Sequence, residues 1–358
     1  MKRFAQRPGY TYQKYKLLIL ASVWLAASMT VIVLLPGLLV RHHPSSLDAK
    51  NGSAVIRPSD QSIEKRWNPD ITLYISKQKK VISLPLETYL KGVVAAEMPA
   101  YFEPEALKAQ AIAARTYILH RFVAGETEGV PVKGALVTDT VAHQAYKTDE
   151  QLRKDWGAAA EANLIKIGKA VEETRGLVLT YEGKLINALF FSTSNGYTEN
   201  SEDYWGSYVP YLRSVPSPWD VPISPRYKET VSMPYGDFLR ELGAGAVSAA
   251  SSRASFIRVT ERTEGRRIGA IRVGDQLLTG KEMRERLGLN SSQFTWKLKG
   301  SRIEITTYGY GHGVGMSQWG ANGMAEKGMK ASQILKYYYS GVKLEDGSKF
   351  VSSQKPAL

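Results

Sequence analysis

The chain has 358 residues, of which 43% are hydrophobic and 23% charged, as in an ordinary globular protein. It contains no cysteine, which excludes disulfides, catalytic thiols and zinc held by thiolates. Its net charge of +13 suits an anionic environment such as wall polymer or lipid headgroups, or simply a well-solvated surface. No basic cluster interleaved with aromatic residues is present, so we expect no nucleic-acid partner.

The N-terminal region contains a long apolar run. Residues 17–40 carry no charged side chain, and a helix of about 24 residues crosses the roughly 30 Å hydrocarbon core of a bilayer. Lys and Arg are concentrated in residues 1–16, which places the N-terminus in the cytoplasm and everything after residue 40 outside. A cleaved signal peptide is the alternative, but the run is longer than usual for one and lacks a clear A-x-A site. We therefore predict a single-pass protein of the cell membrane.

Polar residues 41–68 are expected to form a stalk between this helix and an extracytoplasmic domain at 69–345. A subdomain is expected at about 225–300, and residues 346–358 form a C-terminal tail. The domain should begin with strands at 71–75 and 81–84.

A helix should then start at Pro85, a residue suited to a first helical position, and end before Pro99. The Pro- and Ser-rich residues 214–234 are expected to be a loop. Further helices are predicted at 104–122, 166–175, 235–242, 283–287 (after a capping box at 279–282) and 331–339. Further strands are predicted at 177–181, 185–192 (paired with the preceding strand), 257–261, 267–273, 294–298 and 303–307. Helices and antiparallel strand pairs alternate without βαβ regularity, so the fold class is α+β, with mostly antiparallel strands around a substrate cleft.

Glu97 lies in the last turn of the helix that ends before Pro99. Residues 93–96 are Val, Val, Ala and Ala, and loss of hydration against them should raise the pKa of the Glu97 carboxyl group. The negative end of the helix dipole also disfavours the ionised form. A carboxyl group that stays protonated near neutral pH is what a general acid requires. A surface glutamate near a helix end is the commoner explanation of such a segment taken alone.

The second helix carries polar residues on two faces: Lys108 and Arg115 on one, Gln110 and Tyr117 on the other. Apolar residues surround them on every side, which predicts a buried helix. Buried polar side chains are costly unless paired, so these should meet carboxylates, backbone groups or a ligand in a cleft. Alternatively, one face of the helix is exposed to solvent, and Lys108 and Arg115 lay their aliphatic chains along it with their charged groups in water. A lysine close to Glu97 would lower the pKa of that acid.

Residues 190–200 join a predicted strand to a polar turn. Ser192, Ser194 and Asn195 can hydrogen-bond sugar hydroxyls or acetamido groups, although an ordinary turn has the same composition. The dipeptide that begins at Asn195 favours positive φ. The candidates for a second carboxylate lie next to it: Glu199, Glu202 and Asp203.

Residues 307–321 contain four glycines at alternate positions, which allow close approach of a ligand or another segment. Ser317 is expected to cap the following helix. Ser317, Gln318 and His312 are also predicted to bind substrate. His312 could also be a base or a metal ligand, although a lone structural imidazole is more common. The glycines do not form a dinucleotide-binding fingerprint, because the spacing is wrong and no βαβ unit surrounds them.

Other reaction classes find little support. None of the 5 histidines belongs to an HExxH pattern, so a zinc hydrolase is not expected. An S-x-x-K match at 62–65 lies in the stalk without its companion motifs.

Five segments together resemble the stage II sporulation protein D family, whose wider group includes amidase enhancers. In chain order they are LPLETYLKGVVAAEMP, EALKAQAIAARTY, FFSTSNGYTEN, YLRSVPSPWD and GYGHGVGMSQWGA. The resemblance implies that Glu97 is the catalytic acid. It also marks important polar positions at Lys108, Gln110, Arg115 and Tyr117. Some relatives hold zinc with a histidine and cysteines near the position of His143; this chain has no cysteine, and we expect neither metal nor cofactor.

The resemblance also implies an activity. Sporulation members are lytic transglycosylases that act during engulfment, in the mother-cell membrane facing the forespore. They degrade peptidoglycan glycan strands stripped of peptides by an amidase, stage II sporulation protein P, while stage II sporulation protein M anchors the complex. Their reaction activates no water, so one carboxylate suffices where ordinary glycosidases need two. The alternative is a peptidoglycan-binding scaffold that activates a cell-wall amidase without cutting glycan.

Overall fold

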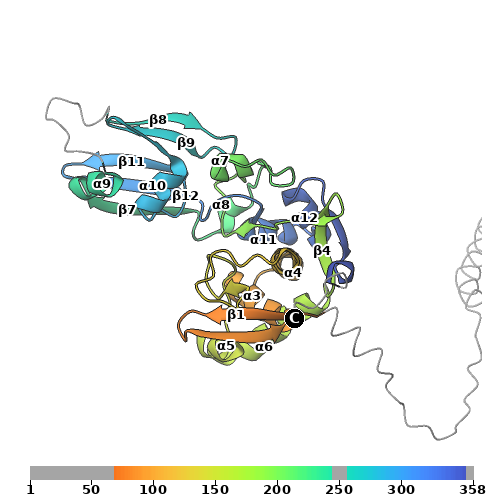
Figure 1. Cartoon of the computed structure of the whole chain (residues 1–358). Coiled ribbons are helices and arrows are strands. Elements are labelled where there is room, and N and C mark those ends of the chain that lie inside the picture. Colours follow the sequence, from red (N-terminus) through yellow and green to blue (C-terminus); the bar gives the residue numbers. More distant parts are fainter. Residues whose placement is uncertain (1–67, 244–255, 352–358) are drawn as a thin grey trace, which may run out of the picture. The chain divides into compact units, whose positions relative to one another are not determined.

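The computed structural model describes residues 68–243 and 256–351, all within one compact unit, Arg57–Leu358 (Figure 1). The predicted cytoplasmic tail, membrane helix and nearly all of the stalk lie outside the described residues. Within the described ranges, no helix is long and apolar enough to cross a bilayer. The described part mixes helices with mainly antiparallel sheets, as the α+β prediction expected.

The described chain opens with the predicted hairpin of β1 (Asp70–Ile75) and β2 (Lys80–Pro85). Alternate residues of β1 are buried, because successive side chains of a strand point to opposite faces. Strand β3 (Val137–Thr138) adds to β1 in parallel. Pro85 ends β2 and directly precedes helix α3 (Leu86–Glu97). The helix therefore begins one residue later than predicted.

Helix α4 (Pro104–Ala124) lies at the centre of the main hydrophobic core. Its apolar residues occur all round the helix, so every face needs a partner, and the prediction that it is buried is confirmed. Gly125 ends it in the left-handed conformation. The elements packed around it are α3, α6 (Ala160–Glu172), α11 (Gln318–Glu326), α12 (Ala331–Tyr338) and β4 (Leu177–Tyr181).

Residues 228–308 enclose a second hydrophobic core, and we call this part the second lobe and the remaining described residues the main lobe. The second lobe contains two three-stranded antiparallel sheets, in the orders β10-β9-β8 and β11-β12-β7. Its strands are β7 (Lys228–Pro234), β8 (Ile257–Arg262), β9 (Ile268–Val273), β10 (Gln276–Thr279), β11 (Phe294–Lys299) and β12 (Arg302–Tyr308). Its helices are α9 (Tyr235–Leu242) and α10 (Gly280–Arg286), and α10 begins with the predicted capping box.

One loop prediction and one strand prediction were wrong. Residues 214–234 were expected to be a loop, but their last part forms β7, an edge strand that pairs with β12. Most side chains of β7 are exposed, so its sequence lacks the apolar alternation of a half-buried strand.

Residues 185–192 were expected to be one strand paired with β4. Only β5 (Lys184–Leu185) pairs there, whereas β6 (Phe190–Phe191) pairs in parallel with the distant β13 (Met316–Ser317).

Several short elements were not predicted; the first begins with a capping box of Thr148 and Gln151 that the sequence analysis missed, and the others have no strong local signal. They are α5 (Asp149–Trp156), the 3-10 turn Gly157–Ala159, α7 (Ser201–Trp205), α8 (Asp220–Ile223), β14 (Lys343–Asp346) and α13 (Ser348–Val351). Strand β14 pairs with β4, and α13 follows it within the expected C-terminal tail. Helix α6 begins six residues earlier than the helix expected at 166–175.

The alternate glycines of 307–321 pack against another segment of the chain. A Cβ added at Gly309 or Gly311 would lie 2.8 Å from the Thr193 carbonyl oxygen or 2.9 Å from the Phe191 Cβ, respectively. At Gly315 it would lie 2.0 Å from the Leu189 carbonyl oxygen. The glycines therefore let the 309–315 loop lie directly on the backbone around β6.

Gly315→Ala is expected to destabilise the protein strongly. Gly315 has a φ of +81°, which costs a Cβ-bearing residue roughly 1–2 kcal/mol, and the overlap with Leu189 should add roughly 1–3 kcal/mol. Gly328→Ala is the matched control, because Gly328 has a φ of +84° with nothing within 4 Å of the added Cβ. Denaturant unfolding of the full chain measures both, and equal losses would contradict the packing argument.

Candidate active site

Glu97 is held by two hydrogen bonds from distant parts of the chain. It is the last residue of α3, and its Oε1 accepts the backbone N–H of Ala145 at 2.7 Å. Its Oε2 accepts the side-chain amide of Gln318 at 3.0 Å. Gln318 is the first residue of α11. The Ser317 side chain accepts the Gly320 N–H and so caps this helix, as predicted.

Burial raises the pKa of the half-buried Glu97 carboxyl group, and this effect outweighs the two hydrogen bonds, which lower it. The direction agrees with the expectation from the apolar residues 93–96. Lys108 does not oppose it, because its ammonium group pairs elsewhere, 3.0 Å from Glu105 and 2.7 Å from Glu173.

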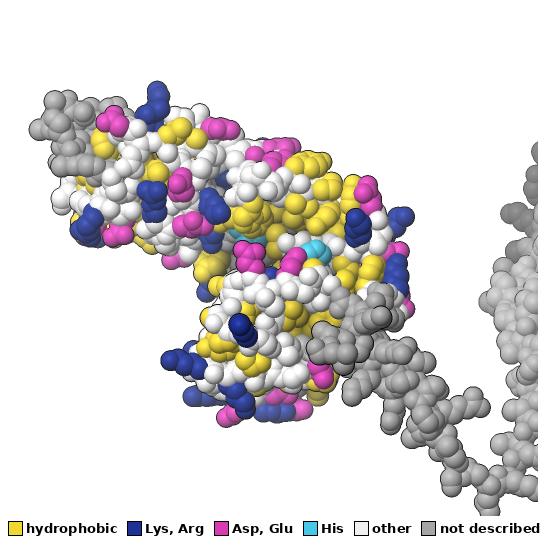
Figure 2. All heavy atoms as spheres, viewed as in Figure 1, with side chains coloured by type: hydrophobic (Ala, Val, Ile, Leu, Met, Phe, Trp, Pro, Cys, Tyr) yellow, Lys and Arg dark blue, Asp and Glu magenta, His cyan; other side chains and the backbone are white. Residues whose placement is uncertain are grey.

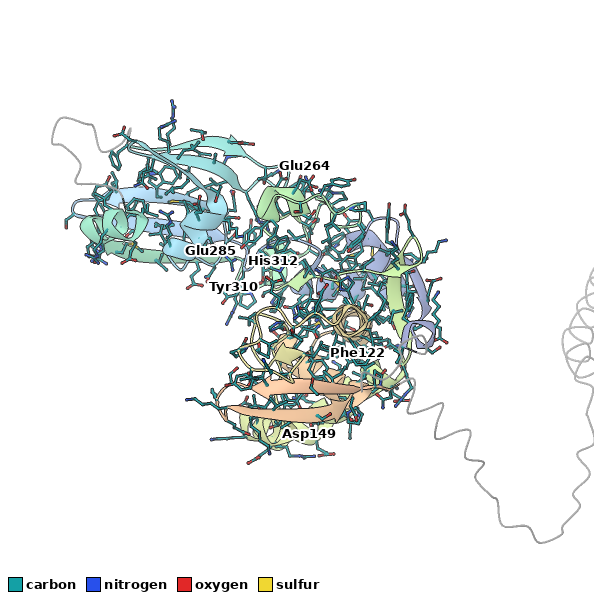
Figure 3. The ribbon with its side chains drawn as sticks, in the orientation of Figure 1. Phe122, Asp149, Glu264, Glu285, Tyr310 and His312 are labelled. Carbon is teal, nitrogen blue, oxygen red and sulfur yellow. The ribbon has the colours of Figure 1, made fainter. Side chains whose placement is uncertain are left out.

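Two hollows meet at Glu97. The larger has a volume of about 650 Å³, and residues of both lobes line it. The smaller has a volume of about 410 Å³. Three residues line both: Glu97, Ser192 and Gln318. Figure 2 shows the surface hollowed where the lobes meet, and Figure 3 places Glu285, Tyr310 and His312 at this junction.

Aromatic side chains line both hollows. In the larger one, the ring centroid of Trp205 lies 4.8 Å from that of Tyr204 and 5.3 Å from that of His312. In the smaller one, Trp319 packs edge-on against Phe102 at 4.7 Å. Trp205 keeps 43% of its surface exposed, and Tyr101, beside Phe102, keeps 70%. Flat apolar surfaces are thus available on both sides of Glu97.

His312 is a neutral group of the larger hollow. Burial, followed by the charges of Arg284 and Arg267, lowers the pKa of His312 to about 3. Its Nδ1 accepts the Val314 backbone N–H at 3.1 Å. The imidazole is therefore uncharged near neutral pH: it keeps the N–H of Nε2 but does not act as a cationic acid.

The structure brings five of the predicted site residues to the hollows: Glu97, Tyr117, Ser192, His312 and Gln318. It does not bring Arg115 there. The Arg115 side chain is fully buried in the main core and binds both carboxylate oxygens of Glu87, at 2.9 and 2.7 Å. It also donates to the carbonyl groups of Val171 and Leu177. Arg115 and Lys108 are thus paired with carboxylates, one of the outcomes expected for polar residues of a buried helix.

Gln110 also lies away from the hollows. Its side chain has no exposed surface, and among the described residues neither its amide nitrogen nor its amide oxygen has a hydrogen-bond partner.

The predicted hydroxyl and amide ligands near residue 195 support the fold of the site. Ser194 and Ser317 are fully buried, and both bind the buried Asp220 carboxylate, through the Ser194 backbone N–H at 2.8 Å and the Ser317 hydroxyl. The side chain of Asn195 accepts the Tyr197 N–H within its own turn and donates to the Gly265 carbonyl of the second lobe, so it joins the turn to that lobe. These three residues hold the segments that carry Ser192 and Gln318.

The candidates for a second carboxylate also lie outside the two hollows. Glu199 is buried and accepts hydrogen bonds from Thr263 and the Gly265 N–H, and Glu202 binds Arg213. Asp203 accepts a hydrogen bond from Asn200. Apart from Glu97, the carboxylate that lines the larger hollow within the described ranges is Glu285 of α10.

Several lining residues were missed by the sequence analysis. Among them are Tyr101, Phe102, Trp156, Tyr204, Trp205, Arg226, Lys281, Arg284, Glu285, Tyr310 and Trp319. The residues from α10 carry no signal beyond a short capped helix. Among the described residues, no group of three His, Cys, Asp or Glu side chains could hold a metal ion. His143 also lines the larger hollow, and its ring hydrogen-bonds the Thr138 hydroxyl and the Glu128 carbonyl group.

Comparisons with known proteins identify the family of the chain. Residues 74–181 match the family model described as Stage II sporulation protein (SpoIID). The chain is 42% identical over 339 residues to the stage II sporulation protein D of Bacillus subtilis (strain 168), covering 92% of this chain and 97% of that protein. It is 43% identical to the protein of that name from Bacillus amyloliquefaciens, with the same coverage. The amidase enhancer of Bacillus subtilis (strain 168) is 32% identical to it, over 71% of this chain and 40% of that protein. The chain belongs to the stage II sporulation protein D family of sporulation proteins.

Proposed function

We propose that the protein is a membrane-anchored lytic transglycosylase that cleaves peptide-stripped glycan strands of peptidoglycan during engulfment. The observation that carries this proposal is the position of Glu97: a half-buried carboxyl group with a raised pKa, where two aromatic-lined hollows meet. Such a carboxyl group suits proton donation near neutral pH. The aromatic rings on either side suit the apolar faces of successive sugars.

In this mechanism a single carboxyl group acts twice. Glu97 donates its proton to the glycosidic oxygen as the bond from that oxygen to the anomeric carbon breaks. The resulting Glu97 carboxylate takes the proton of the C6 hydroxyl of the same muramic residue, and O6 bonds to the anomeric carbon. The products are a 1,6-anhydromuramic end and a strand with a free hydroxyl group, and Glu97 is again protonated. No water is consumed.

The candidate that competes with transglycosylation is hydrolysis with a second carboxylate. Ordinary glycosidases need two carboxylates, and Glu285 is the other one that lines the larger hollow within the described ranges. The full chain, incubated with peptide-stripped glycan, should release fragments with 1,6-anhydro ends, as identified by mass spectrometry. Fragments with ordinary reducing ends, lost on Glu285→Gln, would mean hydrolysis and contradict the proposal.

Activity should fall as pH rises through the raised pKa of Glu97, because only the protonated carboxyl group can donate. The pH profile of kcat/KM reports the groups of the free enzyme and should show this falling limb above the usual glutamate range. His312, with its pKa of about 3, does not titrate there. A profile that rises with pH over the same range would assign the proton to another group.

The proposed setting follows the family. We place the N-terminus in the cytoplasm and the catalytic domain outside, in the mother-cell membrane facing the forespore. The proposed partners are stage II sporulation protein P, which removes the peptides, and stage II sporulation protein M, which anchors the complex.

A second candidate function is activation of a cell-wall amidase by a protein that binds glycan without cutting it. The similarity to an amidase enhancer favours it. Adding the full chain or its Glu97→Gln variant to a purified amidase separates the roles. Stimulation by both, with glycan cleavage by the wild type only, would mean that the two functions coexist; stimulation without cleavage by either would leave the scaffold alone.

A further inference from the structure

Two cationic side chains of the second lobe line the larger hollow together with Glu97. Lys281 and Arg284 lie three residues apart on α10, and residues at this spacing share a helix face. Both side chains are half-buried. The hollow thus has the proposed acid on the main lobe and two positive charges on the second lobe.

Neither cation has an anionic partner within the described residues. No carboxylate there lies within 4.0 Å of Lys281 or Arg284, whereas Arg286 of the same helix lies 3.5 Å from Glu282. Arg284 donates from Nη1 to the Tyr204 hydroxyl at 2.8 Å, but its buried Nε has no partner there. The Lys281 ammonium lies 5.3 Å from the centre of the Tyr204 ring. Partly buried cations that lack an anionic partner favour binding of an anion.

The other charges around the hollow leave it positive. Glu285 lines it but is exposed, so water screens its charge. The buried Arg267 lies behind the loop of His312, but its guanidinium group lies 3.9 Å from the buried Glu199 carboxylate, which offsets much of its charge. His312 itself is neutral: burial first, and then the charges of Arg284 and Arg267, lower its pKa.

We propose that Lys281 and Arg284 bind the lactyl carboxylate of muramic acid and so select strands without peptides; this rests on the proposed function. The lactyl group of a peptide-free muramic residue ends in a carboxylate, which a guanidinium group recognises through parallel hydrogen bonds. When a peptide is attached, the same carbon belongs to a neutral and bulkier amide. The two cations are therefore specificity-determining residues of the second lobe.

Binding to a non-cleaving chain tests this selection. The full chain with Glu97→Gln is titrated with peptide-free glycan oligosaccharides, and with the same oligosaccharides after their carboxyl groups are converted to methylamides. We expect about tenfold tighter binding of the carboxylate form, as for hydrogen bonds to a charged group. Adding Lys281→Gln and Arg284→Gln should remove the preference while the melting temperature stays close to that of the parent. Equal affinity of the parent for both forms would overturn the proposal, as would a preference kept by the triple variant.

Arg272→Gln is the matched control. Arg272 is exposed on β9, lies outside the hollow and loses one positive charge on substitution, as Lys281→Gln or Arg284→Gln does singly, so its variant should keep the preference. Loss of the preference there would reduce the effect to net charge and contradict the proposal. The assay is independent of catalysis: a wild-type chain that prefers the carboxylate form but releases no fragments would contradict the proposed function alone. A wild-type chain that cleaves both forms equally would contradict the selection alone.

Discussion

Replacing Glu97 with glutamine is expected to abolish release of anhydromuramic fragments, with a loss in kcat of roughly 10²–10⁴ or more. Glutamine keeps the shape of the side chain, and its oxygen can still accept the Ala145 N–H while the Gln318 amide turns over. The fold should therefore survive. Quantifying fragments by mass spectrometry measures the loss.

The pH dependence of the unfolding free energy provides a check that the Glu97→Gln variant is folded. Burial raises the pKa of Glu97 in the folded chain, so the folded state holds this proton more tightly than the unfolded state. The contribution of Glu97 to stability is thus full below the ordinary glutamate pKa and is lost as pH rises through the raised value. The Glu97→Gln variant should lack this loss and be at least as stable as the wild type at neutral pH.

Glu103→Gln is the matched control for catalysis. Glu103 is an exposed carboxylate that precedes α4, six residues further along the chain, and it does not line either hollow. Its variant should cleave glycan at the wild-type rate. Wild-type cleavage by the Glu97→Gln variant would remove the proposed acid and leave the scaffold function.

Arg115→Ala is expected to cost roughly 3–5 kcal/mol of unfolding free energy, because it leaves the Glu87 carboxylate buried without its partner. Denaturant unfolding of the full chain measures this. Arg153→Ala is the control, since Arg153 pairs with Glu161 at 2.7 Å on the surface, where water screens the pair and its loss should hardly change the stability.

This experiment separates two roles for Arg115. A residue that binds glycan would, on substitution, leave the stability unchanged and weaken binding. Substitution of a residue that stabilises the core would lower the stability, but it would leave glycan binding unchanged at temperatures where the variant is still folded. Unchanged unfolding of the Arg115→Ala variant would contradict the structural role.

Local patterns were enough for much of the fold. Residue periodicity and proline positions predicted β1, α3 and α4, and a capping box predicted the start of α10. These signals arise within a few residues, so they can be read without knowing what packs against them. The edge strand β7 lacked such a signal because solvent covers most of its side chains.

The candidate site also combines features that are local in sequence with features that depend on tertiary packing. The apolar helix end around Glu97 and the cap at Ser317 are local, and both were visible in the amino-acid order. The pairing of Arg115 with Glu87 required the packing of α3 on α4, and the sequence alone left it open whether Arg115 met a carboxylate or a ligand. The contact of Gln318 with Glu97 spans 221 residues, and Lys281 and Arg284 reach the hollow only through the placement of the second lobe. Local order determines which groups are available, whereas tertiary packing decides which of them share one hollow, because only burial against distant segments fixes charges and hydrogen bonds across the chain.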